Sequence, residues 1–155
     1  MPGHLDDVDR RLLAAVQADA RLPQAALGAR VGLSAAAVNR RLRRLTDTGY
    51  ITRTTAVLAP DLLGHPLTVI AQVEVDGDRT DPLDRVHAAF VDCPQVQQCY
   101  WVTGEWDFIL VFLVRDMQQY LGLTRRLFYD TDNVKRFKTL VVLDRNKVTL
   151  DVPVE

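Results

Sequence analysis

A glycine between two helical patterns is the feature that most limits how this chain can fold. Leu27 and Val31 give the first pattern an apolar stripe at helical spacing, and Gly32 follows at once. Glycine readily takes the left-handed conformation that ends a helix, so the chain is expected to turn here. Ser34 can then cap a second helix over residues 35–48. The sequence therefore predicts two short helices joined by a three-residue turn.

The second of these helices is dense in arginine. Its apolar face is narrow, with Val38, Leu42 and Leu45 at positions i, i+4 and i+7. At about 100° per residue, the other side chains divide between the opposite face and the flanks. The opposite face is expected to hold Ala36, Arg40, Arg43 and Arg44, with Asn39 and Arg41 on the flanks. The alanines at the start of this helix are short, so they leave room for these arginines to approach a polyanion closely.

Charge is divided unevenly along the chain. Residues 1–60 hold nine arginines and five aspartates, a net charge of +4. Residues 61–155 hold ten basic and fifteen acidic side chains, a net charge of −5. Opposite signs suggest two modules with different partners, and only the first suits a polyanion.

The two helices and their turn have the geometry that places a second helix in the major groove of DNA. Arginine can contact phosphate or guanine there, and asparagine can read adenine. The alternative is a solvated basic face on an ordinary helical hairpin. Because turn chemistry, helix length and charge agree, the sequence favours a DNA-binding helix-turn-helix. The candidate contacts are Ser34, Ala36, Asn39, Arg40, Arg41, Arg43, Arg44 and, beyond the helix, Arg53.

The rest of the first module follows from local signals. A preceding helix is expected at residues 5–19, with Asp6 as its cap. Residues 50–58 are rich in β-branched side chains and could form a small wing or a strand that leads out. Two prolines and a glycine within residues 60–66 indicate a hinge. We therefore expect a winged or plain helix-turn-helix domain over 1–51, a linker over 52–66 and a second domain over 67–155.

The second domain is predicted to follow the order βαββαβ. Strands are expected at residues 67–75, 96–102, 108–114 and 134–143, and helices around Val86 and Phe90 and around Tyr120 and Leu127. This order is that of the ferredoxin-like fold, so the chain as a whole is predicted to be α+β.

The third predicted strand is apolar on both faces. Phe108, Leu110 and Phe112 lie on one face, and Ile109, Val111 and Leu113 on the other. Helices cover only one sheet face in this fold, and the third strand is central. The uncovered face would expose a large apolar patch, so we expect at least a homodimer with its sheets face to face. A dimer also suits paired helix-turn-helix units that read two half-sites.

Several other classes of protein have little support. Cys93 and Cys99 fit neither a zinc site nor a disulfide framework, and the three histidines are scattered, so no metal and no cofactor are expected. No apolar run approaches the ~20 residues that span a bilayer. The acidic N-terminus lacks the pattern of a secretory signal, so a cytoplasmic protein without a membrane partner is expected.

Short motifs along the chain, taken together and in order, resemble the Lrp/AsnC (feast/famine) family. They are Leu5-Asp-x-x-Asp9, Leu33-Ser34, Arg41-x-x-Arg44-Leu45, Gly49-x-Ile51, Leu63-Gly64, Val102-Thr-Gly-x-x-Asp107 and Lys147. The resemblance implies a regulator of amino-acid or related metabolism that binds double-stranded DNA and is not an enzyme. It also implies a small effector, often an amino acid, at a subunit interface, and dimers that assemble into octamers.

The resemblance places the effector near the link between the second and third strands. The implied residues are Thr103, Gly104, Glu105, Trp106 and Asp107, with Phe137 and Thr139 from a neighbouring subunit. Glycine lets a ligand approach backbone N–H groups, and Asp107 could pair with an ammonium group. From the residues alone, a plain hairpin in which Asp107 satisfies the backbone is an equal alternative. Trp106 replaces the tyrosine or phenylalanine usual in the family, which could reshape the pocket.

Three other functions stay open at this point. Some relatives with this layout resemble sirohaem decarboxylases, which would need histidine and arginine to converge in the second module, where His87 has no obvious partner. A chromatin-organising protein that coats DNA without an effector would carry the same arginines, because contacts to phosphate and to guanine look alike in one dimension. A regulator that responds only through its assembly state would also fit.

Overall fold

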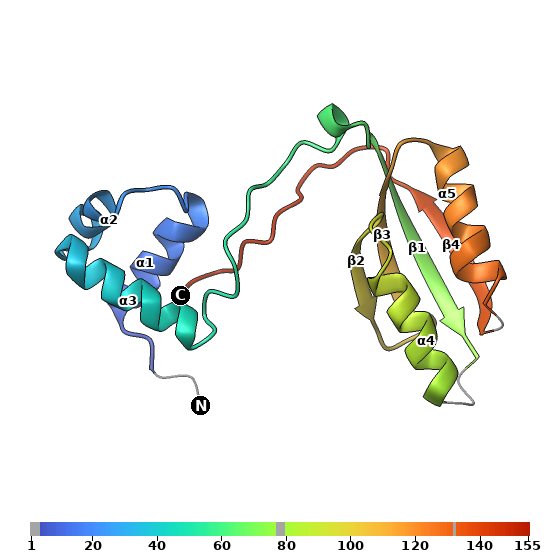
Figure 1. The fold of residues 1–155 in the computed structure, drawn as a ribbon, viewed down its shortest axis with the longest axis horizontal. Coiled ribbons are helices and arrows are strands. Elements are labelled where there is room, and N and C mark those ends of the chain that lie inside the picture. Colours follow the sequence, from blue (N-terminus) through green and yellow to red (C-terminus); the bar gives the residue numbers. More distant parts are fainter. Residues whose placement is uncertain (1–3, 77–79, 132) are drawn as a thin grey trace. The chain divides into compact units, whose positions relative to one another are not determined.

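The computed structural model describes residues 4–76, 80–131 and 133–155, and its contacts divide the chain into two compact units (Figure 1). Unit 1 contains the chain up to Val57 together with Lys147–Glu155, and unit 2 contains Leu58–Asn146. The sequence had assigned the last nine residues to the second domain. They group with unit 1 because the side-chain amide of Gln17 donates to the Val152 carbonyl (2.9 Å) and accepts from the Val152 N–H (3.0 Å).

Unit 1 is a three-helix module. Its helices are α1 (Asp7–Ala18), α2 (Gln24–Val31) and α3 (Ala35–Asp47), and α1 and α3 lie within two residues of their predicted bounds. Asp6 caps α1 as predicted, since its carboxylate accepts from the Asp9 N–H at 2.7 Å. The helices enclose a small core of Leu12, Leu27, Val31 and Val38.

Two glycines allow the turn between α2 and α3. Gly32 has φ 73° and ends α2 in the predicted left-handed conformation. Gly28 lies inside α2, where a Cβ would be only 2.3 Å from the Leu33 carbonyl oxygen. The turn can therefore lie directly on α2 only because position 28 has no side chain. Ser34 then begins α3, and its Oγ accepts from the Ala37 N–H at 3.2 Å.

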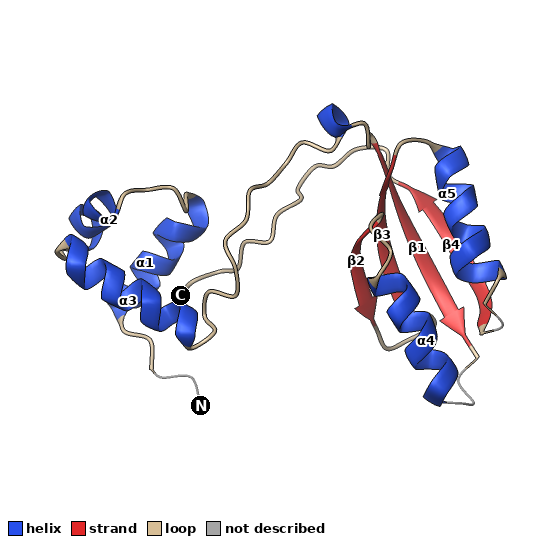
Figure 2. Cartoon of the chain, viewed as in Figure 1, coloured by secondary structure: helices blue, strands red, loops and turns tan. Residues whose placement is uncertain are grey.

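The segment between α3 and the first strand has little regular structure. Residues 52–59 form neither helix nor strand within this chain, and one 3-10 turn, Asp61–Leu63, follows them (Figure 2). The strand predicted for this segment does not form in it: β-branched side chains favour extended backbone, but a strand also needs a partner to pair with.

Unit 2 is an antiparallel sheet with two helices on one face. Its elements are β1 (Leu67–Val75), α4 (Thr80–Val91), β2 (Val96–Trp101), β3 (Phe108–Val114), α5 (Met117–Thr124), a π-helical turn (Arg125–Tyr129) and β4 (Val134–Val141). The strands lie in the order β2-β3-β1-β4, so β3 is central as predicted. Figure 1 shows α4 and α5 over the same face of the sheet. The predicted βαββαβ order is confirmed.

Burial alternates along the strands and separates the two faces of the sheet. On the covered face, Val69 and Val73 of β1 and Leu110 and Phe112 of β3 have no exposed surface. On the open face, Ile109, Val111 and Leu113 of β3 are half-buried. The sheet therefore has one complete core and one apolar face without a helix layer.

The close approach at Gly28 generates a stability prediction. Gly28→Ala is expected to destabilise unit 1 by ~1–3 kcal/mol, because the Leu33 backbone must move to admit the methyl group. Thermal unfolding followed by circular dichroism measures the loss. Gly122→Ala in α5 is the matched control, since its added Cβ meets nothing within 4 Å and alanine favours a helix. Equal changes in melting temperature for the two variants would contradict the close approach.

Candidate functional site

The exposed face of α3 gathers several of the predicted nucleic-acid contacts. Ala36, Asn39, Arg40 and Arg43 are all exposed there. Within the described part of the chain, Arg40 and Arg43 have no hydrogen bond or ion pair, so both guanidinium groups are available to an anion. This face can meet phosphates and base edges without first breaking a contact.

Two further predicted contacts lie beside this face. Ser34 is exposed at the start of α3, where its Oγ is already engaged by the capping bond. Arg53 is exposed in the segment that follows α3. Neither side chain is buried, and Arg53 can add a positive charge at the edge of the helix-turn-helix.

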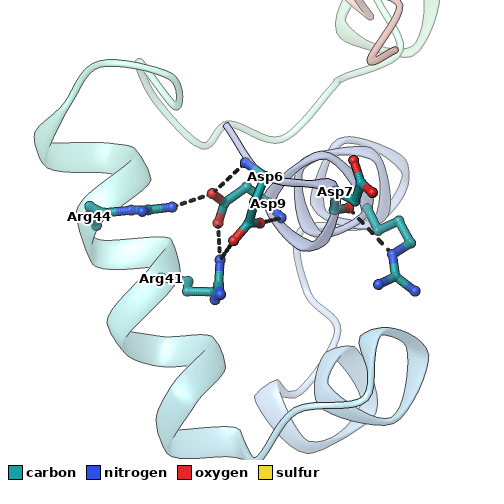
Figure 3. Close-up of polar contacts among 6 residues, drawn as sticks. Asp6, Asp7, Asp9, Arg41 and Arg44 are labelled. Carbon is teal, nitrogen blue, oxygen red and sulfur yellow. Dashed lines mark hydrogen bonds and ion pairs between the residues drawn. The ribbon is translucent and has the colours of Figure 1, made fainter. Parts of the chain in front are cut away.

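Arg41 and Arg44 reach across to the start of α1 instead (Figure 3). Arg41 Nη1 lies 2.8 Å from Asp9 Oδ1 and 2.6 Å from Asp6 Oδ2. Arg44 Nη2 pairs with Asp9 Oδ2. Arg44 is therefore exposed, as predicted, but its guanidinium group turns to Asp9 and is not free like those of Arg40 and Arg43. The reason is Asp9, which has no exposed surface and so needs positively charged partners.

These contacts shift the pKa of Asp6 and of Arg41. The hydrogen bond from Arg41, together with the capping bond from the Asp9 N–H, lowers the pKa of Asp6 to about 2. The hydrogen bonds to Asp6 and Asp9 raise the pKa of Arg41. The charged forms of Asp6 and Arg41 are therefore favoured, and the ion pairs of this set tie α3 to α1.

The motif Leu5-Asp-x-x-Asp9 thus has a local and a long-range role. Its two aspartates form a capping box, because the Asp6 N–H also donates to Asp9 Oδ2 at 3.2 Å. That local role can be predicted from acidic residues three positions apart at a helix start. The contact with α3 could not, since it depends on how the helices pack.

The link between β2 and β3 carries the predicted effector residues. Thr103, Gly104 and Glu105 are exposed, and Gly104 has φ 126°, a conformation that other residues rarely adopt. Asp107 is tied to β1: its N–H donates to the Val73 carbonyl at 2.9 Å, and its Oδ2 accepts from the Val75 N–H at 2.8 Å. Of the two roles left open for Asp107, the backbone role is present. Among the described residues, its Oδ1 has no hydrogen-bond partner and could still meet a ligand.

Arg136 of β4 lies beside this link, although no sequence pattern marked it. Its guanidinium carbon is 4.5 Å from the centre of the Trp106 ring, and its Nη2 is 3.1 Å from Glu105 Oε1. It also pairs with Glu74 of β1, which raises the pKa of Arg136. The hydrogen bonds from Lys135 and Arg136 together lower the pKa of Glu74. Only the register of β4 on β1 brings these groups together.

Phe137 and Thr139 point to the helix-covered side of the sheet within one chain. Thr139 Oγ1 lies 2.8 Å from the Tyr120 hydroxyl oxygen, and the Phe137 ring centre lies 4.7 Å from that of Phe128. Both side chains are therefore engaged by the α5 layer, and the structure of one chain does not join them to residues 103–107.

The described residues show no other type of site. Among them, no three His, Cys, Asp or Glu side chains are grouped so that they could hold a metal ion. Cys93 is a buried free thiol and Cys99 a partly buried one. In the same part of the chain, no helix has the length and apolar character needed to cross a bilayer.

Comparisons with known proteins match both units. Residues 5–52 match the model of a winged helix-turn-helix DNA-binding domain, and residues 68–151 match that of the Lrp/AsnC ligand binding domain. The chain is 42% identical to an uncharacterized HTH-type transcriptional regulator of Sinorhizobium fredii, over 97% of this chain and 89% of that one. It is 32% identical to the leucine-responsive regulatory protein of Escherichia coli, over 92% of this chain and 87% of that one.

Solved structures with the same fold agree. A transcriptional regulator from Neisseria meningitidis, in complex with L-methionine, has a TM-score of 0.92 at 27% identity and covers 97% of both chains. A feast or famine regulatory protein from M. tuberculosis, complexed with L-methionine, has a TM-score of 0.87 at 29% identity and covers 96% of this chain and 99% of that one. These relatives are transcription regulators and lend no support to the enzyme alternative. This chain belongs to the Lrp/AsnC family of helix-turn-helix transcription regulators.

Proposed function

We propose that this chain regulates amino-acid or related metabolism as a homo-oligomer, binding double-stranded DNA through α3 and an amino acid beside the β2–β3 link. The observation that supports it most is the exposed α3 face, where Arg40 and Arg43 have no partner among the described residues. A regulator of this kind acts at the chromosome, in the cytoplasm.

The α3 surface suggests how DNA would be held. Ala36 leaves room for the start of α3 to enter the major groove. Asn39, Arg40 and Arg43 would then face base edges or phosphates, and Arg53 would add a contact to the backbone. Ser34 would fix the first turn of α3, whose free N–H groups favour a phosphate.

A second copy of the chain is the proposed partner of the open sheet face. One apolar row crosses the open face, from Leu140 of β4 through Ile70 of β1 to Val111 of β3. Within this row, Leu140 is 40% exposed. Two such faces packed together would remove this row from water and present two α3 helices to two half-sites. Octamers of these dimers follow from the resemblance to the family.

An amino acid is the proposed effector because two of the similar structures were solved with L-methionine. Around the β2–β3 link, exposed backbone at Thr103–Glu105 could take its carboxylate, and Asp107 Oδ1 could take its ammonium group. Trp106, held under Arg136, would bound the side-chain pocket. Phe137 and Thr139 of a neighbouring subunit would complete the site.

The DNA-binding proposal is tested by the double variant Arg40→Ala, Arg43→Ala. Its affinity for a duplex from upstream of the protein's own gene should fall by at least about tenfold, with a flatter salt dependence, because phosphate contacts are lost. Fluorescence anisotropy at two salt concentrations measures this, and light scattering should find the oligomer unchanged. Unchanged affinity at both concentrations would contradict the proposal. Affinity for random duplex within a few-fold of the best site would favour a chromatin-coating role instead.

The effector proposal is tested by thermal shift with L-methionine and the other amino acids. A ligand should raise the melting temperature of the parent and leave Asp107→Ala unshifted, because the ammonium contact is lost. Asp116→Ala is the matched control, since Asp116 Oδ1 also accepts a backbone N–H, from Gln119, but at the start of α5. Equal stabilisation of Asp107→Ala and the parent would place the site elsewhere.

A further inference from the structure

The four arginines within Arg40–Arg44 are not equivalent, although they share one helix and one charge. Arg40 and Arg43 are exposed and have no partner in the described ranges 4–76, 80–131 and 133–155. Arg41 and Arg44 are bound to Asp6 and Asp9. Helical spacing separates the two pairs, because positions 41 and 44 lie three residues apart on the side of α3 that faces the start of α1.

Asp9 is the centre of this arrangement (Figure 3). Its Oδ1 accepts from Arg41 at 2.8 Å, and its Oδ2 accepts from Arg44 and from the Asp6 N–H. Asp6 Oδ2 accepts a further bond from Arg41 at 2.6 Å. Two carboxylates thus neutralise two guanidinium groups, and the buried member of the set, Asp9, has partners on both oxygens.

Moving either arginine to a phosphate would weaken this set. A buried carboxylate that loses its partner is strongly destabilising, whereas an ion pair exposed to water contributes little. Arg44 is the more exposed of the two, with 49% of its side chain accessible, but its guanidinium group is committed to the oxygen of a residue with no exposed surface. DNA binding would therefore leave both arginines where they are.

We propose that Asp9, assisted by Asp6, divides the arginines of α3 into a DNA-binding pair and a bracing pair. Arg40 and Arg43 contact DNA, while Arg41 and Arg44 hold α3 against α1 and neutralise no phosphate. Asp9 is a positioning residue, which sets both the orientation of α3 and the number of its charges that DNA can use. This division rests on the proposed DNA-binding function.

The test compares two substitutions at neighbouring arginines, each of which removes one positive charge. Arg43→Gln and Arg44→Gln are made in the full chain, and the affinity for duplex DNA is measured over a range of salt concentrations. Arg43→Gln should reduce the slope of log affinity against log salt by about 0.9 per bound subunit, the value for one lost phosphate contact. Arg44→Gln should leave the slope unchanged and lower the melting temperature. Arg41 still pairs with Asp9 in that variant, which keeps the unit folded.

A second comparison releases the bracing pair. Asp9→Asn should steepen the salt dependence relative to Asp7→Asn, because the freed guanidinium groups can then reach phosphates. Asp7 is the matched control: it lies on the same turn of α1, is exposed, and contacts Arg11 only through its backbone carbonyl. A purely structural role for Asp9 would lower the melting temperature without steepening the slope. If Asp9→Asn does not fold, the Arg43 and Arg44 comparison decides alone.

The outcomes separate this inference from the function on which it rests. Equal flattening of the slope by Arg43→Gln and Arg44→Gln would overturn the division of the arginines while leaving DNA binding intact. A parent chain that shows no salt-dependent affinity for duplex DNA would overturn both proposals.

Discussion

A carboxylate that is removed from water must be paired, and in this chain that requirement determines how the helix-turn-helix is held together. Asp9 lies at the start of α1 with no exposed surface, and among the described residues its positive partners are Arg41 and Arg44 of α3. The apolar core below is small, so these ion pairs fix which way α3 faces. Because Arg41 and Arg44 pair with Asp9, Arg40 and Arg43 are left on the side of α3 that faces solvent.

The turn before α3 imposes a second constraint in the same unit. The Leu33 carbonyl lies against α2 at a place where no side chain fits, so the separation of the two helices depends on Gly28. Capping by Ser34 then starts α3 at one position. Together, the close turn and the arginine contacts with α1 hold α3 at both of its ends. In unit 2 the corresponding constraint is a sheet with one helix-covered face, whose other face is the surface proposed to pack against a second copy of the chain.

Features that depend on neighbouring residues could be predicted from the sequence. Gly32 and Ser34 mark the turn, Asp6 marks the cap of α1, and the apolar run of β3 marks a central strand. The end of β4 was predicted at residue 143, two residues late, because pairing with β1 stops where the Val142 N–H meets the Thr68 carbonyl. Local pattern therefore predicts the elements well and their last residues less well.

Features that depend on packing between distant residues could not be predicted. A helical wheel places Arg44 on the outer face of α3 but cannot show that its guanidinium group pairs with Asp9 of α1. Arg136 reaches Trp106 and Glu105 only through the register of β4, and Gln17 meets Val152 across most of the chain. Each of these contacts joins residues at least 30 positions apart. In the candidate sites, the types of residue could thus be predicted from the sequence, but the residues that they contact could not.

Arginine-selective modification, mapped by peptide mass spectrometry, can show whether the arginines of α3 are divided between DNA and α1. The full chain would be treated with a dicarbonyl reagent with and without duplex DNA. Arg40 and Arg43 should react readily in the free protein and become protected on DNA, while Arg41 and Arg44 should react slowly in both states. Equal reactivity of all four arginines in the free protein, with equal protection by DNA, would show that the arginines are not divided in this way.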